Sequence, residues 1–305
     1  MKKRMVFRLA CLLVAILSAV SPALAVDWDF KGSLGEGEHT HYVPPVSNPF
    51  LNETPYITTE ARPIYMYNDV PGGFLAVGGE AGGGYFNLLA LQLRLALTDR
   101  LGFIINKNGY MDFNHKSSKF FTDDGLANIA FGLKYALLSD PAQATIVTAG
   151  FTYEMPSGTL KTGFYRLQGD GNGFINLFVT AAKSYDKLSL QSMLGTKITL
   201  DQERSATWLN YAAHVDYEIL PGLFPLMEFN FFLPINDPRQ NQFNYEGLDL
   251  VSIGGADPQG VVTLAGGARY KLSKTVVAGM VYEAPLTNDK DITDWRVTAD
   301  LVFYY

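Results

Sequence analysis

Residues 206–233 of this chain read ATWLNYAAHVDYEILPGLFPLMEFNFFL, and this stretch decides the fold. In its first arm every second side chain from Leu209 to Ile219 is apolar or aromatic, whereas the alternate positions are small, polar or charged. Side chains of a β-strand alternate between two faces, so one face of this arm is apolar and the other polar. Pro221 and Gly222 then turn the chain, and a second alternating arm follows. Each arm has about the 9–11 residues that a tilted strand needs to cross a bilayer.

The same alternating unit repeats along the chain from Ile57 onward. Leucines occupy every second position from Leu89 to Leu97, which excludes a helix, because a helical apolar stripe recurs every three to four residues. We count about twelve such strands up to Tyr305. The chain is 48% hydrophobic, yet no stretch beyond the N-terminus approaches ~18 uninterrupted apolar residues. The sequence therefore predicts an all-β protein, a transmembrane antiparallel up-and-down β-barrel of the outer-membrane type.

Connections of two lengths alternate between the predicted strands. Tight turns follow Leu97, Leu137, Tyr185, Ile219 and Leu272. Long segments separate most of the other pairs, at residues 68–85, 111–125, 156–172 and 234–259. Outer-membrane barrels have short periplasmic turns and longer external loops, so we expect the tight turns at the periplasmic end.

The N-terminus carries the pattern of a secretory signal peptide. Four basic residues precede an apolar run at residues 9–20, and Ala23 and Ala25 frame a small-x-small cleavage site. We expect residues 1–25 to be removed, and loss of these four positive charges changes the formal net charge from −6 to −10. This balance argues against nucleic acid as a partner, since phosphate binding needs clustered Lys and Arg. The single cysteine, Cys11, leaves with the signal peptide.

Residues 26–56 form an irregular N-terminal segment that is rich in glycine and proline. Two placements stay open for it, as a plug folded back into the lumen or as a periplasmic extension. The barrel itself would then occupy residues 57–305. His39 and His41 in this segment have no further spaced ligands around them, so we expect no metal site. No motif in the chain calls for a cofactor.

The polar faces of the predicted strands carry many charges. Facing lipid at the bilayer midplane would cost roughly 2–4 kcal/mol for each Arg or Lys, so we expect these side chains to line the lumen. A barrel of about 8 strands is filled by side chains and one of about 16–18 encloses an aqueous channel, so an intermediate barrel could be open or plugged. The lumen-lining candidates are Glu60, Arg62, Arg94, Lys134, Glu154, Lys197, His214, Asp216, Glu218, Glu228, Arg269, Arg296 and Asp300.

Residues 124–135, DGLANIAFGLKY, resemble a motif of the MetA-pathway phenol-degradation family of outer-membrane transporters. The strand end Met155-Pro156-Ser157-Gly158 and the terminal aromatic Tyr305 are also similar to that family. The resemblance covers residues 57–305. It implies uptake of small, often hydrophobic or aromatic compounds across the outer membrane, and it supplies no defined binding residues.

Three functions fit a barrel of this kind. The first is a channel for passive passage of small solutes, with outer-membrane lipid and small molecules as its partners. The second is a structural or adhesive barrel whose external loops bind another molecule. The third is an outer-membrane hydrolase, for which His214 and Asp216 on one face could supply a base and its orienting carboxylate. No grouping of Ser, His and acid carries a nucleophile signature, so we expect no enzyme and predict no catalytic residue.

Overall fold

The computed structural model describes residues 29–34, 42–76, 82–117, 123–163, 165–236, 238, 245–255 and 259–305. The predicted signal peptide, residues 1–25, lies outside these ranges, as do His39 and His41. Within the described ranges, no helix has the length and apolar character required to cross a membrane.

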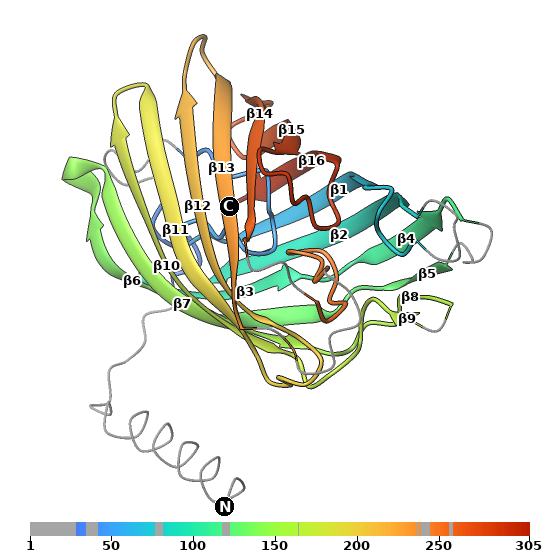
Figure 1. Ribbon diagram of the computed structural model, residues 1–305. Helices are drawn as coiled ribbons and strands as arrows, with labels where there is room; N and C mark the ends of the chain where they lie inside the picture. Colours follow the sequence, from blue (N-terminus) through green and yellow to red (C-terminus); the bar gives the residue numbers. More distant parts are fainter. Residues whose placement is uncertain are drawn as a thin grey trace, which may run out of the picture.

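Antiparallel strands close into a barrel (Figure 1). The strands are β1 (Glu60–Val70), β2 (Gly84–Ala96), β3 (Leu101–Lys107), β4 (Tyr110–His115), β5 (Asp123–Leu126), β6 (Ile129–Asp140), β7 (Thr145–Met155), β8 (Lys161–Thr162), β9 (Tyr165–Arg166), β10 (Phe174–Tyr185), β11 (Leu188–Thr199), β12 (Thr207–Tyr217), β13 (Leu223–Asn236), β14 (Val261–Lys271), β15 (Val276–Pro285) and β16 (Trp295–Tyr304). Neighbours in the chain pair around the wall, and pairing of β1 with both β16 and β2 closes it. A short 3-10 turn, η2 (Pro141–Gln143), joins β6 to β7, while β8 and β9 form a separate two-stranded hairpin.

Two positions of the wall are each shared by two strands. β3 and β4 pair with different halves of β2, and β6 and β5 continue them at the next position. In the gap between β3 and β4, the Asn108 side chain bonds both the N–H and the carbonyl of Leu91, in place of a backbone ladder. The circumference therefore has twelve strand positions, which confirms the predicted fold class and strand number.

The prediction of an external loop at residues 111–125 is wrong. Its two ends lie in β4 and β5, which pair with each other, with Asp112 opposite Asp124. In β4 the apolar side chains Met111 and Phe113 are buried on the inner face, whereas Asp112 and Asn114 stand on the outer face, and β5 is short and begins with two Asp residues. The pattern that identifies a lipid-facing strand is therefore absent here, although the backbone continues the ladder.

The two faces of the wall differ in character as the alternation predicts. Along β2, Leu89 and Leu93 are 62% and 40% exposed, whereas Gln92 and Arg94 on the other face are 0% and 4% exposed. Large apolar side chains therefore cover the outside, where only lipid can bury them. Exposed tyrosines stand near the short connections, at Tyr185, Tyr217 and Tyr270.

The described end of the N-terminal segment lies inside the barrel. We call residues 42–58 the plug, because Val43 and Ile57 are fully buried and the segment bonds inward side chains of many strands. Of the two placements that the sequence leaves open, this part of the segment takes the one in the lumen. The plug then leads directly into β1 at the end of the barrel that carries the short connections, here called the turn end.

A second segment also turns into the lumen, from the opposite or loop end. Residues 245–255, between β13 and β14, are here called the inturned loop, and Leu250 and Val251 within it are fully buried. Both belong to the same apolar cluster as Phe50 at the tip of the plug. The plug and the inturned loop therefore meet within the barrel.

Candidate functional site

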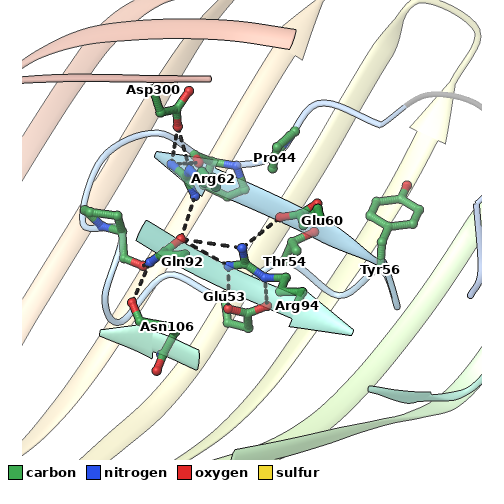
Figure 2. Close-up of polar contacts among 12 residues, drawn as sticks. Pro44, Glu53, Thr54, Tyr56, Glu60, Arg62, Gln92, Arg94, Asn106 and Asp300 are labelled. Carbon is green, nitrogen blue, oxygen red and sulfur yellow. Dashed lines mark hydrogen bonds and ion pairs between the residues drawn. The ribbon is translucent and has the colours of Figure 1, made fainter. Parts of the chain in front are cut away.

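At the turn end, two arginines of the wall hold the plug by its carbonyl groups. Arg62 Nη2 donates to the carbonyl of Pro45 at 2.8 Å, and Arg269 donates to the carbonyls of Pro44 and Pro45. Asp300 accepts from both guanidinium groups, at 2.6 Å from Arg62 Nε and 2.7 Å from Arg269 Nη1. The proline pair keeps both carbonyls free for these contacts, because prolines have no N–H and do not enter a regular ladder. One carboxylate thus orients two cations toward one short stretch of plug backbone. Figure 2 shows Asp300, Arg62 and Pro44 of this group.

A second cluster surrounds Glu53 of the plug (Figure 2). Arg94 forms a bidentate pair with Glu53, 2.7 Å on each side, and reaches Glu60 at 2.8 Å. Lys134 donates to Glu53 Oε1 and to the carbonyls of Thr54 and Tyr56, at 2.6–2.9 Å. All three ammonium protons of this lysine can therefore be used by the plug.

The Glu53 carboxyl is ionised because of these neighbours. Burial alone would raise its pKa, but the charges of Arg94 and Lys134 outweigh burial and lower the pKa to about 2. The plug is therefore held by a full negative charge at any pH above that range.

Glu228 of β13 binds the middle of the plug. Its two carboxylate oxygens accept from the backbone N–H groups of Val46 and Ser47, at 2.8 and 2.5 Å. The same carboxylate lies 2.8 Å from Nδ1 of His214, whose Nε2 lies 3.0 Å from Asp216. Both ring nitrogens of His214 therefore face carboxylates, and neither is aimed at a hydroxyl nucleophile of the kind an acyl-transfer enzyme requires.

At the loop end, further ion pairs lie inside the barrel. Lys107 pairs with Glu154 at 2.8 Å, and Arg296 pairs with Asp249 of the inturned loop at 3.0 Å. Lys197 lies over the ring of Phe174, 4.2 Å from its centroid.

The inturned loop is fastened by its own backbone. Asp291 accepts from the N–H groups of Glu246 and Gly247, at 3.1 and 2.8 Å, and Glu246 accepts from Gly254 at 3.0 Å. Burial raises the pKa of Asp291 to about 7 and the pKa of Glu246 to about 8. The fastening of this loop therefore depends on carboxyl groups that titrate near neutral pH.

The lumen is closed in this state. Side chains that line a water-filled channel would be exposed to it, yet twelve of the thirteen predicted lumen residues are at most 6% exposed. They are packed against the plug, the inturned loop and one another. Of the open and the plugged barrel that the sequence allows, the structure has the plugged form.

The remaining predicted residue lies elsewhere. Glu218 follows the last residue of β12 and accepts from the N–H of Gly222 in the turn, so it caps the turn instead of entering the lumen. Sequence reasoning also missed Lys107, because a register shift between Ile105 and Lys107 interrupts the alternation and puts this lysine on the inner face. Glu53 was missed because the irregular N-terminal segment has no periodicity from which a face could be assigned.

No known protein family matches this sequence, and no curated protein is similar to it. Solved structures share its fold. The COG4313 outer membrane channel from Pseudomonas putida F1 matches with a TM-score of 0.58 and 13% identity, over 87% of this chain and 100% of that chain. The KdgM porin matches with a TM-score of 0.45 and 10% identity, over 80% and 99% of the two chains. The β domain of the Bordetella autotransporter BrkA gives 0.47 and 12%, over 81% and 100%.

At these identities the likeness concerns the fold. The first of these structures shares a barrel that spans nearly all of this chain. A closed barrel with an apolar outer face is also the only strand architecture that lipid accepts, since every backbone group is paired within the wall. The chain is therefore an outer-membrane β-barrel, in fold and in location, as the sequence predicts.

Proposed function

We propose that this barrel is a channel for passive passage of small solutes and that the plug closes it at rest. The observation that carries the proposal is how the plug is held. Arg62, Lys134, Glu228 and Arg269 bind its backbone through charged groups. A barrel serving only as a scaffold would gain more from an apolar filling, because well-packed apolar residues in place of buried ion pairs are often neutral or stabilising. A charged inner wall is useful where water and solutes pass.

The same contacts allow the plug to move. Water can replace each hydrogen bond to the plug backbone, so the net contribution of one such bond to a charged side chain is only about 1.5–3 kcal/mol. A plug held this way can be displaced in steps, and the wall left behind is polar and readily hydrated. An apolar core of equal size would resist opening, since water does not replace its contacts.

The solute class and the organisation of the chain belong to the same proposal. Resemblance of residues 124–135 to the phenol-degradation family supports small hydrophobic or aromatic solutes, and the neighbour from Pseudomonas putida is itself described as an outer membrane channel. We propose further that residues 1–25 are a cleaved signal peptide. Residues 26–56 would then be the N-terminal segment, whose described part from residue 42 lies in the lumen, and residues 57–305 the barrel.

Conductance in planar bilayers tests the channel. Arg269→Gln removes the cation that binds Pro44 and Pro45, so we expect at least a severalfold rise in open-channel current over the native protein. Arg204→Gln is the matched control, because Arg204 is half exposed and pairs with Asp170 on the surface. Heat-modified migration on gels would verify that each variant is a folded barrel. Folded protein that never conducts, in either variant and at any voltage, would contradict the proposal.

The two other functions remain distinguishable. An adhesive barrel would present its long loops outward, whereas the described part of the β13–β14 connection turns into the lumen. For a hydrolase, Arg269→Gln should not change activity in the way it changes current, and His214→Ala should abolish cleavage of phospholipid or ester substrates. Lipase activity that disappears in His214→Ala would favour the enzyme over the channel.

A further inference from the structure

Lys197 differs from the other buried basic residues of the lumen. The described part of the chain buries seven lysines and arginines, and six of them form an ion pair within 4 Å. Lys197 is only 1% exposed, and its polar contacts are long ones, 3.4 Å to the carbonyl of Leu248 and 3.5 Å to Ser252 Oγ. A buried ammonium group without a carboxylate partner is costly unless an anion completes it.

Two neighbours of Lys197 on adjacent strands also have unsatisfied polar atoms. Asn176 of β10 and Trp208 of β12 are its direct partners in the ladder. Asn176 Oδ1 and Trp208 Nε1 are buried and have no hydrogen-bond partner. Asn176 is 7% exposed and Trp208 is 3% exposed. One row across three strands therefore offers an acceptor, a cation and an N–H donor.

The carboxylates near this row do not compensate Lys197. Glu154 acts on it from beyond 4 Å and is already bonded by Lys107 and Asn128, each at 2.8 Å. Glu246 of the inturned loop also acts from a distance. Burial raises the pKa of Glu246 to about 8, so this group carries little charge at neutral pH.

We propose that Lys197 and Trp208 bind the carboxylate of a small organic acid with a ring-sized apolar body. The ammonium group and the indole N–H stand on neighbouring strands and can each donate to one carboxylate oxygen. Aromatic and aliphatic groups accompany them. The Phe174 ring lies under the Lys197 ammonium, and Trp208 packs with Leu248 and Phe232. Once the inturned loop is displaced, an apolar body would contact these groups, whereas a bare inorganic anion would leave them unused.

The inturned loop covers this site at rest. Its Leu248 and Ser252 supply the two long contacts to Lys197, and Leu248 packs on Trp208. A ligand carboxylate would replace these weak contacts with charge-assisted ones, so binding and displacement of the loop are coupled. The inference rests on the proposed function, because it names the solute that the channel selects at its loop end.

Calorimetric titration of the detergent-solubilised full chain with sodium benzoate tests the site. We expect saturable binding that is weakened at least tenfold in Lys197→Met and severalfold in Trp208→Phe. Lys183→Met is the matched control, because Lys183 stands on the outer face of β10 and should leave binding unchanged. Acetate, which lacks the ring, and benzyl alcohol, which lacks the charge, should each bind at least tenfold more weakly than benzoate.

The outcomes separate this inference from the channel itself. Benzoate binding that is absent, or that is equal in Lys197→Met and the native protein, would overturn the inference whether or not the barrel conducts. Should Lys197→Met fail to fold as judged by gel migration, Lys197→Arg and Trp208→Phe decide the matter, with binding retained in the first and weakened in the second. Lys197-dependent binding to a barrel that never conducts would uphold the site and reject the channel.

Discussion

The two ends of the lumen are built from the same residue types, but they differ in how completely their buried cations are paired. At the turn end every buried cation has a carboxylate partner, and the groups around Arg62, Arg94, Lys134 and Arg269 close on the plug. At the loop end the inturned loop is attached more sparsely, and Lys197 and its neighbours keep unsatisfied polar atoms.

This difference suggests separate roles for the two ends of the barrel in the proposed channel. A buried cation with a carboxylate partner is held in one arrangement, whereas a buried cation without one is costly unless an anion completes it. In the proposed channel, the turn end is the closure that must be broken for passage. The loop end is then the entrance, where Lys197 and its neighbours would bind a solute.

The largest expected effect comes from breaking the closure at Arg94. Arg94→Ala leaves Glu53 and Glu60 buried with fewer partners, and breaking a buried pair in this way costs about 3–5 kcal/mol. Arg204→Ala removes a surface pair with Asp170 and should cost about 0–1 kcal/mol. Unfolding in urea, followed by loss of the heat-modifiable gel form, measures both. Equal losses in the two variants would mean that the turn end is no more firmly built than the surface.

Acid should weaken the closure through Glu53. Its folded pKa, about 2, lies below the ordinary value of 4.5, so its stabilising effect is present above pH 4.5 and is lost as pH falls toward 2. The shift corresponds to about 3 kcal/mol at neutral pH. Glu53→Gln should remove this part of the acid sensitivity, which melting temperatures at pH 7 and pH 3 would show. An unchanged difference between the two pH values would rule out Glu53 as the acid-sensitive group.

The inturned loop should respond to pH in the opposite direction. Burial raises the pKa of Glu246 to about 8, so the unfolded loop loses its proton first and the folded loop weakens as pH rises from about 4.5 to 8. Inside this window, Glu246 should increase opening by up to tenfold per pH unit, and Asp291 adds its own factor below about pH 7. Hydrogen exchange at Gly247 and Gly254, corrected for intrinsic rates, reports the opening. Glu246→Gln should reduce the slope, and the remainder belongs to Asp291, whose pKa is raised to about 7 by burial.

The barrel could be predicted from the sequence because its physics is local. Lipid outside and charge inside impose a period of two, which is visible strand by strand in stretches such as Leu89–Leu97. The two-residue alternation did not predict the structure where the outer face of a strand is not apolar. The outer face of β4 carries Asp112 and Asn114, β5 is short and polar, and at Lys107 a register shift reverses the face.

The interior could be predicted only as a list of inward charges. Which charges meet depends on partners such as Arg62 and Asp300, 238 positions apart in the chain. Many side chains of the wall bond carbonyl groups of the plug. Every residue has a carbonyl, so the sequence does not show that those of Pro44 and Pro45 are the ones bound. The sequence therefore predicted a plug in the lumen as one of two placements of the N-terminal segment. It did not predict the contacts of the plug.

The smallest expected effect tests whether the Trp208 N–H at the loop end lacks a hydrogen-bond partner. Trp208→Phe removes an indole N–H that has no partner, and it also removes part of a buried ring. Relief of the unpartnered donor offsets the lost packing, so the free energy of unfolding should change by no more than about 1 kcal/mol. Lys134→Met at the turn end removes one of the two cations paired with Glu53 and the donor to the Thr54 and Tyr56 carbonyls, so it should cost about 3–5 kcal/mol in the same assay. A loss of that size in Trp208→Phe would mean that the N–H already has a partner at rest, and the loop end would then be as complete as the turn end.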